Sequence, residues 1–208
     1  MMQRKYSMWV FVALVVIVPF VAFGIISWYQ SNMQKLPVYK NENDQQISFN
    51  MINQKGEMIT NKNWDEKIVV VNFFFTHCPV ICPKMMRNLE QVQKSFSNDD
   101  EVMINSFSVD PGRDSVQRLL TYAAQMGIKT DNWNLLTGDK KDIYRLARKS
   151  FLVVATDGDG GETDFIHSDK VILLDTKKRI RGFYDGTNTA EMTQLIKDIK
   201  KLKEEKIG

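Results

Sequence analysis

The 208-residue sequence is poor in cysteine and histidine, with two of each, and its formal net charge is only +3. Two cysteines cannot form the disulfide framework of a small secreted scaffold or a four-cysteine zinc site. A balanced charge without a basic stripe interleaved with aromatics argues against nucleic-acid binding. Since 43% of the residues are hydrophobic and 25% are charged, wholesale disorder is excluded and a globular protein is expected.

Long apolar runs are absent except for one near the amino terminus. Met8–Tyr29 carries no charge and is longer than the roughly 20 residues that a membrane-spanning helix needs. Tryptophan and tyrosine stand at its ends, and Arg4 and Lys5 before it predict a cytoplasmic amino terminus. A cleaved signal peptide would have a shorter apolar region followed by small residues. The expected organisation is a cytoplasmic segment at 1–7, an uncleaved single-pass anchor at 8–29, a polar tether at 30–44 and one domain at 45–208.

The domain shows the pattern of an α/β fold. Ile68–Phe75 is a nearly continuous run of β-branched and aromatic residues, which is typical of a central strand covered on both faces. Before it, alternating residues on either side of Lys55-Gly56 predict a hairpin. Residue spacing then predicts, in order, a helix over 82–96, a strand over 102–109, a helix capped by Asp114 or Ser115, a strand over 133–136, a helix after Asp139, strands over 171–174 and 180–184, and a closing helix. This is the plan of a thioredoxin-like domain, a mixed sheet with helices on both faces.

Both cysteines lie directly after the predicted central strand, in the segment Thr76-His77-Cys78-Pro79-Val80-Ile81-Cys82-Pro83. Sites in open α/β sheets form beyond the carboxyl ends of the strands. If Pro83 is the first helical residue, its missing N–H costs nothing and Cys82 is the N-cap, where the helix dipole lowers a thiol pKa. The three-residue spacing leaves a redox disulfide, a metal site and two inert buried cysteines open.

The two histidines differ in what they can do. His77 adjoins Cys78, so its side chain should diverge from the thiol and have a local role. His167 follows a glycine-rich acidic loop at 157–164 and precedes the strand that faces the cysteine loop in such a sheet. It either completes a Cys-Cys-His set or lies on the surface. Two thiolates and one imidazole suit Cu(I) and Cu(II), whereas zinc would require a fourth ligand.

These motifs together resemble the Sco/SenC family of copper-delivery proteins. The resemblance covers roughly residues 45–202 and rests on the cysteine segment, on Asp110-Pro111-Gly112-Arg113-Asp114-Ser115 and on His167-Ser168. It implies a membrane-anchored thioredoxin-like domain that faces outward, with Cys78, Cys82 and His167 as copper ligands. It also implies a role in assembling the binuclear copper centre of cytochrome c oxidase subunit II. Members often carry aspartate where this chain has Val80 and Ile166.

The leading hypothesis is a copper metallochaperone of the bacterial cytoplasmic membrane, with its carboxyl-terminal domain outside the cytoplasm. A thiol reductant, an upstream copper donor and the oxidase subunit are the expected partners. The alternative is a thiol-disulfide oxidoreductase or electron carrier that uses Cys78 and Cys82. The absence of a proline before Val171, where thioredoxin-like oxidoreductases carry a cis-proline, weakens this alternative. A peroxiredoxin-like peroxidase is disfavoured because Thr76 is too close to Cys78 for the usual arrangement.

Overall fold

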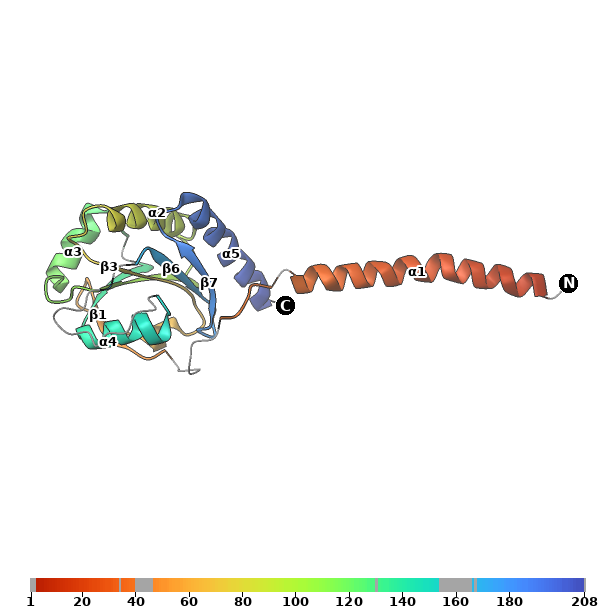
Figure 1. The fold of residues 1–208 in the computed structure, drawn as a ribbon, viewed down its shortest axis with the longest axis horizontal. Helices are drawn as coiled ribbons and strands as arrows, with labels where there is room; N and C mark the ends of the chain where they lie inside the picture. The colour runs from red at the N-terminus through yellow and green to blue at the C-terminus, as the bar shows by residue number, and fades with distance from the viewer. Residues whose placement is uncertain are drawn as a thin grey trace. The chain divides into compact units, whose positions relative to one another are not determined.

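In the computed structural model, residues 3–33, 35–39, 47–129, 131–153, 166 and 168–207 are described. The chain divides into two compact units, Met1–Lys35 and Leu36–Gly208. Figure 1 shows the ribbon of both. The predicted ligand His167 and the glycine-rich loop at 157–164 lie outside the described residues.

The first unit consists of helix α1, Gln3–Met33. The helix continues past its predicted end at Tyr29, because residues 30–33 include neither glycine nor proline. Large apolar side chains between residues 11 and 26 are exposed, and Phe20 is 75% exposed. Where side chains are described, no helix of this chain combines the length and the apolar character needed to cross a membrane. The anchor at Met8–Tyr29 stays a prediction.

The second unit is built on a seven-stranded sheet with the order β2-β1-β5-β4-β3-β6-β7. Strand β3 runs parallel to β4, and β4 runs parallel to β5, whereas β1, β2, β6 and β7 pair antiparallel with their neighbours. The strands are β1 Asn50–Asn53, β2 Met58–Thr60, β3 Ile68–Phe74, β4 Val102–Ser108, β5 Trp133–Thr137, β6 Lys170–Leu174 and β7 Ile180–Asp185. The sheet is therefore mixed, with its parallel part at the centre.

Helices cover both faces of this sheet. Figure 1 shows α2 and α5 on one side and α4 on the other. The helical elements are the 3-10 turn η1 Asn61–Trp64, α2 Ile81–Ser95, α3 Val116–Gln125, α4 Lys140–Arg145, its π-helical continuation η2 Leu146–Ser150, and α5 Thr189–Ile207. Two hydrophobic cores result, one between the sheet and α2, α3 and α5, the other between the sheet and α4 with η2.

Strand β3 is buried along its whole length because its alternate side chains enter different cores. Val70 and Phe74 pack in the core that contains α2, and Val69 and Phe73 pack in the core that contains α4. Burying one such side chain contributes about 1.5–3 kcal/mol. The strand is thus held from both sides, and its carboxyl end is a rigid base for the segment that follows.

The α/β prediction is confirmed in the order and type of its elements. The hairpin turns at Gly56, whose φ of 81° is readily adopted by glycine. Ser115 is the N-cap of α3 and accepts from the Arg118 N–H, so the choice between two predicted caps falls on Ser115. Strand β1 begins at Asn50 rather than at Ile47, which is buried in the core but does not pair.

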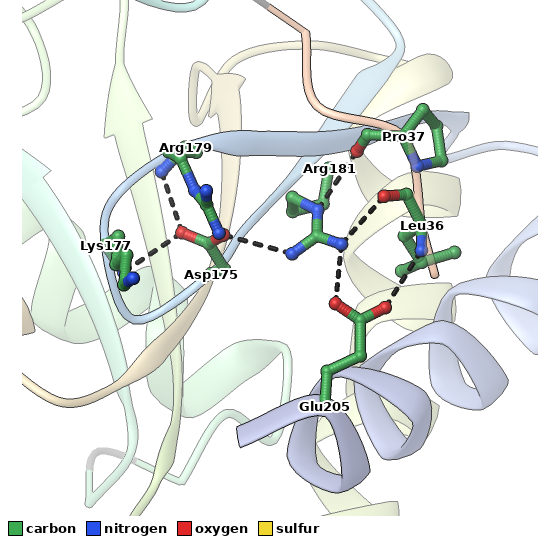
Figure 2. A network of polar contacts seen from close by, with 7 residues as sticks. All are labelled: Leu36, Pro37, Asp175, Lys177, Arg179, Arg181 and Glu205. Carbon is green, nitrogen blue, oxygen red and sulfur yellow. Dashed lines mark hydrogen bonds and ion pairs between the residues drawn. The ribbon is translucent and has the colours of Figure 1, made fainter. Parts of the chain in front are cut away.

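A polar network fixes the start of the second unit (Figure 2). Arg181 is 4% exposed and donates to the carboxylates of Asp175 at 3.1 Å and Glu205 at 2.6 Å. It also donates to the carbonyls of Leu36 at 2.7 Å and Pro37 at 3.0 Å, and the Leu36 N–H donates to Glu205 at 2.9 Å. We call Arg181, Glu205, Leu36 and Pro37 the entry clamp. Within the predicted tether, these two backbone residues are held on the domain.

The entry clamp and the cysteine segment lie at opposite ends of the sheet. Strand β6 runs antiparallel to β3, with Leu174 opposite Val69, so the β6–β7 turn lies at the amino end of β3. Cys78 follows the carboxyl end of β3. Strand β3 has seven residues, which corresponds to about 23 Å.

Candidate metal centre

The two cysteines come together at the carboxyl end of β3, where the sequence predicts the site. The segment from Phe75 to Val80 connects β3 with α2. The backbone N–H of Cys82 donates to the sulfur of Cys78 at 3.3 Å, and both are free thiols. Cys78 is half-buried, whereas Cys82 is 4% exposed and belongs to the core beneath α2. One sulfur therefore faces the surface and the other faces the interior.

Helix α2 begins earlier than the sequence analysis predicts. Its N-cap is Val80, so Cys82 is the second helical residue and Pro83 the third. The prediction that Cys82 is the N-cap and Pro83 the first helical residue is wrong. The first backbone N–H groups of a helix have no partner within it, so a proline is tolerated at the third position as well as at the first. The Lys84 N–H makes the bond to the Val80 carbonyl, at 3.4 Å.

The thiol with the lowered pKa is Cys78 and not Cys82, contrary to the prediction. Partial burial raises the pKa of Cys78, but hydrogen bonds from the Cys82 N–H, the Cys82 thiol and the N–H groups of Val80 and Ile81 outweigh it and lower the pKa. Burial is the main cause that raises the pKa of Cys82 to about 12, and the charges of Cys78 and Asp114 add to it. The helix N-terminus thus stabilises the sulfur that precedes it, as an N-cap side chain would accept its N–H groups.

A small pocket connects the cysteines with the segment around His167. Its volume is about 20 Å³, which is enough for one water-sized atom. It is lined by Phe73, Phe74, Phe75, Cys78, Ile81, Cys82, Val109, Ile166 and Ser168. Ile166 and Ser168 are the neighbours of His167 in the sequence. Among the described residues, no three cysteine, histidine or carboxylate side chains gather as a metal site.

His77 has the local contact that the sequence predicts for it. Its side chain is exposed, and its Nδ1 lies 3.2 Å from the hydroxyl oxygen of Thr76. This contact lies beside Cys78, on the side of the segment that joins β3.

Sequence reasoning missed a buried acid beneath the cysteine segment. Asp114 is fully buried and accepts from the backbone N–H of Thr76 at 3.1 Å and from its hydroxyl at 2.6 Å. It also accepts from the Ser108 hydroxyl at 2.5 Å, and Arg118 Nε donates to the Thr76 hydroxyl at 3.0 Å. With the structure known, the sequence does contain a signal for the role of Asp114. Asp114 and Ser115 are both good caps and one helix uses a single cap, so one of the two is free for another task.

Comparison with known proteins places this chain in a family. The family model described as SCO1/SenC matches residues 38–204. A curated relative, "SCO1 protein homolog" of Bacillus subtilis, is 30% identical over 154 residues, which are 73% of this chain and 79% of the relative.

Solved structures agree with this match. One match is BsSco, which is described as a member of the Sco family of cytochrome c oxidase assembly proteins, in work on a disulfide switch. Its TM-score is 0.66 and its sequence identity is 28%, and the match covers 79% of this chain and 96% of that chain. Arabidopsis thaliana ScoI, solved with copper bound, has a TM-score of 0.59 and 25% identity, with 76% and 98% covered. The expected fold is thus matched over most of both chains, and this protein belongs to the SCO1/SenC family.

Proposed function

We propose that this chain is a copper metallochaperone that holds one copper ion on Cys78, Cys82 and His167. The observation that carries the proposal is the pocket in which both cysteines meet Ile166 and Ser168, the residues on either side of His167. The family membership and the Arabidopsis relative solved with copper bound support copper as the ion.

The chemistry of the donor set fits a carrier of copper. Thiolate sulfur selects Cu(I), and imidazole is a good ligand for Cu(II) as well. Three protein ligands leave one side of the ion open, and Cys78 is the ligand that an acceptor can reach, since it is half-exposed. Its lowered pKa favours the thiolate that binds metal, while Cys82 needs the metal itself to displace its proton.

The proposed receiver is subunit II of cytochrome c oxidase, where the copper completes the binuclear centre. BsSco is described as belonging to a family of cytochrome c oxidase assembly proteins, which supports an oxidase as the partner. The two thiols are able to form a disulfide in an oxidising compartment. A thiol reductant and an upstream copper donor are therefore part of the proposal.

We further propose that the charge-free run Met8–Tyr29 holds the domain outside the bacterial cytoplasmic membrane. Its support is the sequence, together with the exposed apolar side chains of α1 between residues 11 and 26. An exposed apolar surface of this extent is favourable in lipid and unfavourable in water. Alkaline carbonate extraction of membranes tests the anchor, which is expected to stay in the pellet.

The copper proposal is tested with a matched pair of histidine variants. The reduced wild-type protein is expected to bind one Cu(I) ion, and X-ray absorption should count two sulfur neighbours and one nitrogen neighbour. His167→Ala should weaken binding by more than the roughly 10–100-fold that losing an outer partner of a ligand costs. His77→Ala, at the exposed histidine beside Cys78, should bind as the wild type does. Wild-type affinity and geometry in His167→Ala would refute the three-ligand site.

A thiol-disulfide oxidoreductase is the second candidate function. The half-exposed Cys78 with its lowered pKa is favourable for a thiol that attacks disulfides, and the buried Cys82 is placed to resolve the mixed disulfide. Insulin reduction at a rate comparable to that of a thioredoxin, lost in Cys78→Ser and kept in His167→Ala, would favour this function over copper delivery.

A further inference from the structure

We propose that Asp114 is a positioning residue for Cys78 and that it acts through Thr76. Asp114 lies in the turn between β4 and α3, 38 residues from Thr76 along the chain, and it is fully buried. It is not among the residues that line the pocket of the two cysteines. Its contacts, and not proximity to a metal, define its task.

Both carboxylate oxygens of Asp114 are engaged by the residues under the cysteine segment. Oδ1 accepts from the Thr76 hydroxyl at 2.6 Å, and Oδ2 accepts from the Thr76 N–H at 3.1 Å and the Ser108 hydroxyl at 2.5 Å. A buried carboxylate is costly unless it is hydrogen-bonded, and bonds to an ionised group are stronger than bonds between neutral groups. Two of the three bonds go to one residue, so Asp114 fixes both the backbone and the side chain of Thr76.

Thr76 is the last residue held in this way before Cys78. Its hydroxyl gives its single proton to Asp114 and accepts from Arg118 Nε at 3.0 Å. The same hydroxyl oxygen lies 3.2 Å from His77 Nδ1. The Cys78 N–H donates to the Phe75 carbonyl at 3.3 Å, which closes a tight turn around Thr76 and His77. The direction in which this turn leaves β3 therefore depends on the Thr76–Asp114 bonds.

The consequence is a fixed distance between two sulfurs that belong to different elements. Cys82 is held by α2 in the core, whereas Cys78 lies in the connection before the helix. With Thr76 held by Asp114, Cys78 stays where the Cys82 N–H reaches its sulfur. A looser turn lowers the effective concentration of one thiol at the other, because the chain then samples more conformations. The part of this inference that concerns copper affinity rests on the proposed function. The part that concerns the equilibrium between the two thiols does not.

Four variants of the full-length chain test the inference. Asp114→Asn removes the charge, and Thr76→Val removes the hydroxyl while it leaves the carboxylate in place. Thr76→Ser keeps the hydroxyl and is the conservative control. Asp198→Asn changes another buried carboxylate, which accepts from Tyr184 and Gln194 on the α5 side of the domain. Each variant is checked for folding by thermal unfolding. The equilibrium between dithiol and disulfide at Cys78 and Cys82 is then measured in glutathione buffers, and Cu(I) affinity is measured by competition with a chelator.

Asp114→Asn and Thr76→Val should lower the effective concentration of the thiol pair about tenfold, because a hydrogen bond to a charged group contributes enough to change an equilibrium by that factor. Thr76→Ser and Asp198→Asn should remain within about twofold of the wild type, and Cu(I) affinity should follow the same order. A folded Thr76→Val protein with the wild-type thiol equilibrium overturns the inference, even where Asp114→Asn fails to fold. If no variant and no wild type binds copper but the thiol equilibria keep this order, the proposed function fails and the positioning role stands.

Discussion

Replacing Arg181 by methionine should destabilise the domain strongly, because it breaks a buried ion pair and leaves its partners in place. The guanidinium is 4% exposed and the Asp175 and Glu205 side chains are 8% and 19% exposed. Removing one partner of such a buried pair costs about 3–5 kcal/mol. For a domain of this size, each kcal/mol lowers the melting temperature by about 2–4 °C. Arg181→Met should therefore lower the melting temperature by roughly 6–20 °C.

Arg179→Met is the matched control for this prediction. Arg179 pairs with the same Asp175 carboxylate but is 46% exposed, so its loss should cost about 1 kcal/mol or less. Thermal unfolding measures both variants. Amide hydrogen exchange gives a local measurement, since the N–H groups of Leu36 and Tyr39 donate to Glu205 and to the Ile180 carbonyl. Exchange at Leu36 should accelerate in Arg181→Met alone. Equal losses of stability in the two variants would refute the reasoning from burial.

Three further predictions concern the thiols, acid and packing. The pKa of Cys78 is lowered and that of Cys82 is raised to about 12. Iodoacetamide should therefore modify Cys78 of the reduced protein first at pH 7–8. Peptide mass spectrometry that finds Cys82 modified equally would contradict this prediction. Burial raises the pKa of Asp175, but hydrogen bonds from its arginine partners outweigh this effect and lower the pKa. The ionised carboxylate therefore stabilises the fold at pH values above its unfolded pKa of about 3.9. This contribution is lost as the pH falls below that value. Urea unfolding between pH 3 and pH 6 should show this loss in the wild type and a flatter profile in Asp175→Asn. A Cβ atom at Gly186 would lie 2.6 Å from Met85 and 2.8 Å from Val171. Gly186→Ala should therefore lower the free energy of unfolding by about 1–3 kcal/mol, measured by denaturant titration. Gly112→Ala is the control and should be neutral, because a Cβ atom there meets nothing within 4 Å.

The parts of the fold that repeat a local pattern were predictable from the sequence. The buried run Ile68–Phe74 gives the central strand, and the spacing of Met85, Leu89 and Val92 gives the core face of α2. The position of both cysteines after that strand follows from the same pattern. Local patterns determine these features because periodic burial of apolar side chains determines the elements themselves.

Features that depend on distant partners were not predictable in this way. A proline is tolerated at the third helical position as well as at the first, so Pro83 could not define where α2 begins. The order of the two thiol pKa values depends on which sulfur enters the core, and the role of Asp114 depends on Thr76, 38 residues away. The site prediction at His167 stays a prediction, since it lies outside the described residues.

The separation of the entry clamp from Cys78 has a consequence for the segment on the amino-terminal side of Leu36. The amino-terminal connection joins the domain at the end of the sheet about 20 Å from the thiols, at Leu36 and Pro37. For the proposed copper function, this means that an acceptor docking over Cys78 would not be crowded by the point of attachment at Leu36. Insertions or deletions on the amino-terminal side of Leu36 should therefore change the reach of the proposed copper carrier and leave the arrangement of the two sulfurs unchanged.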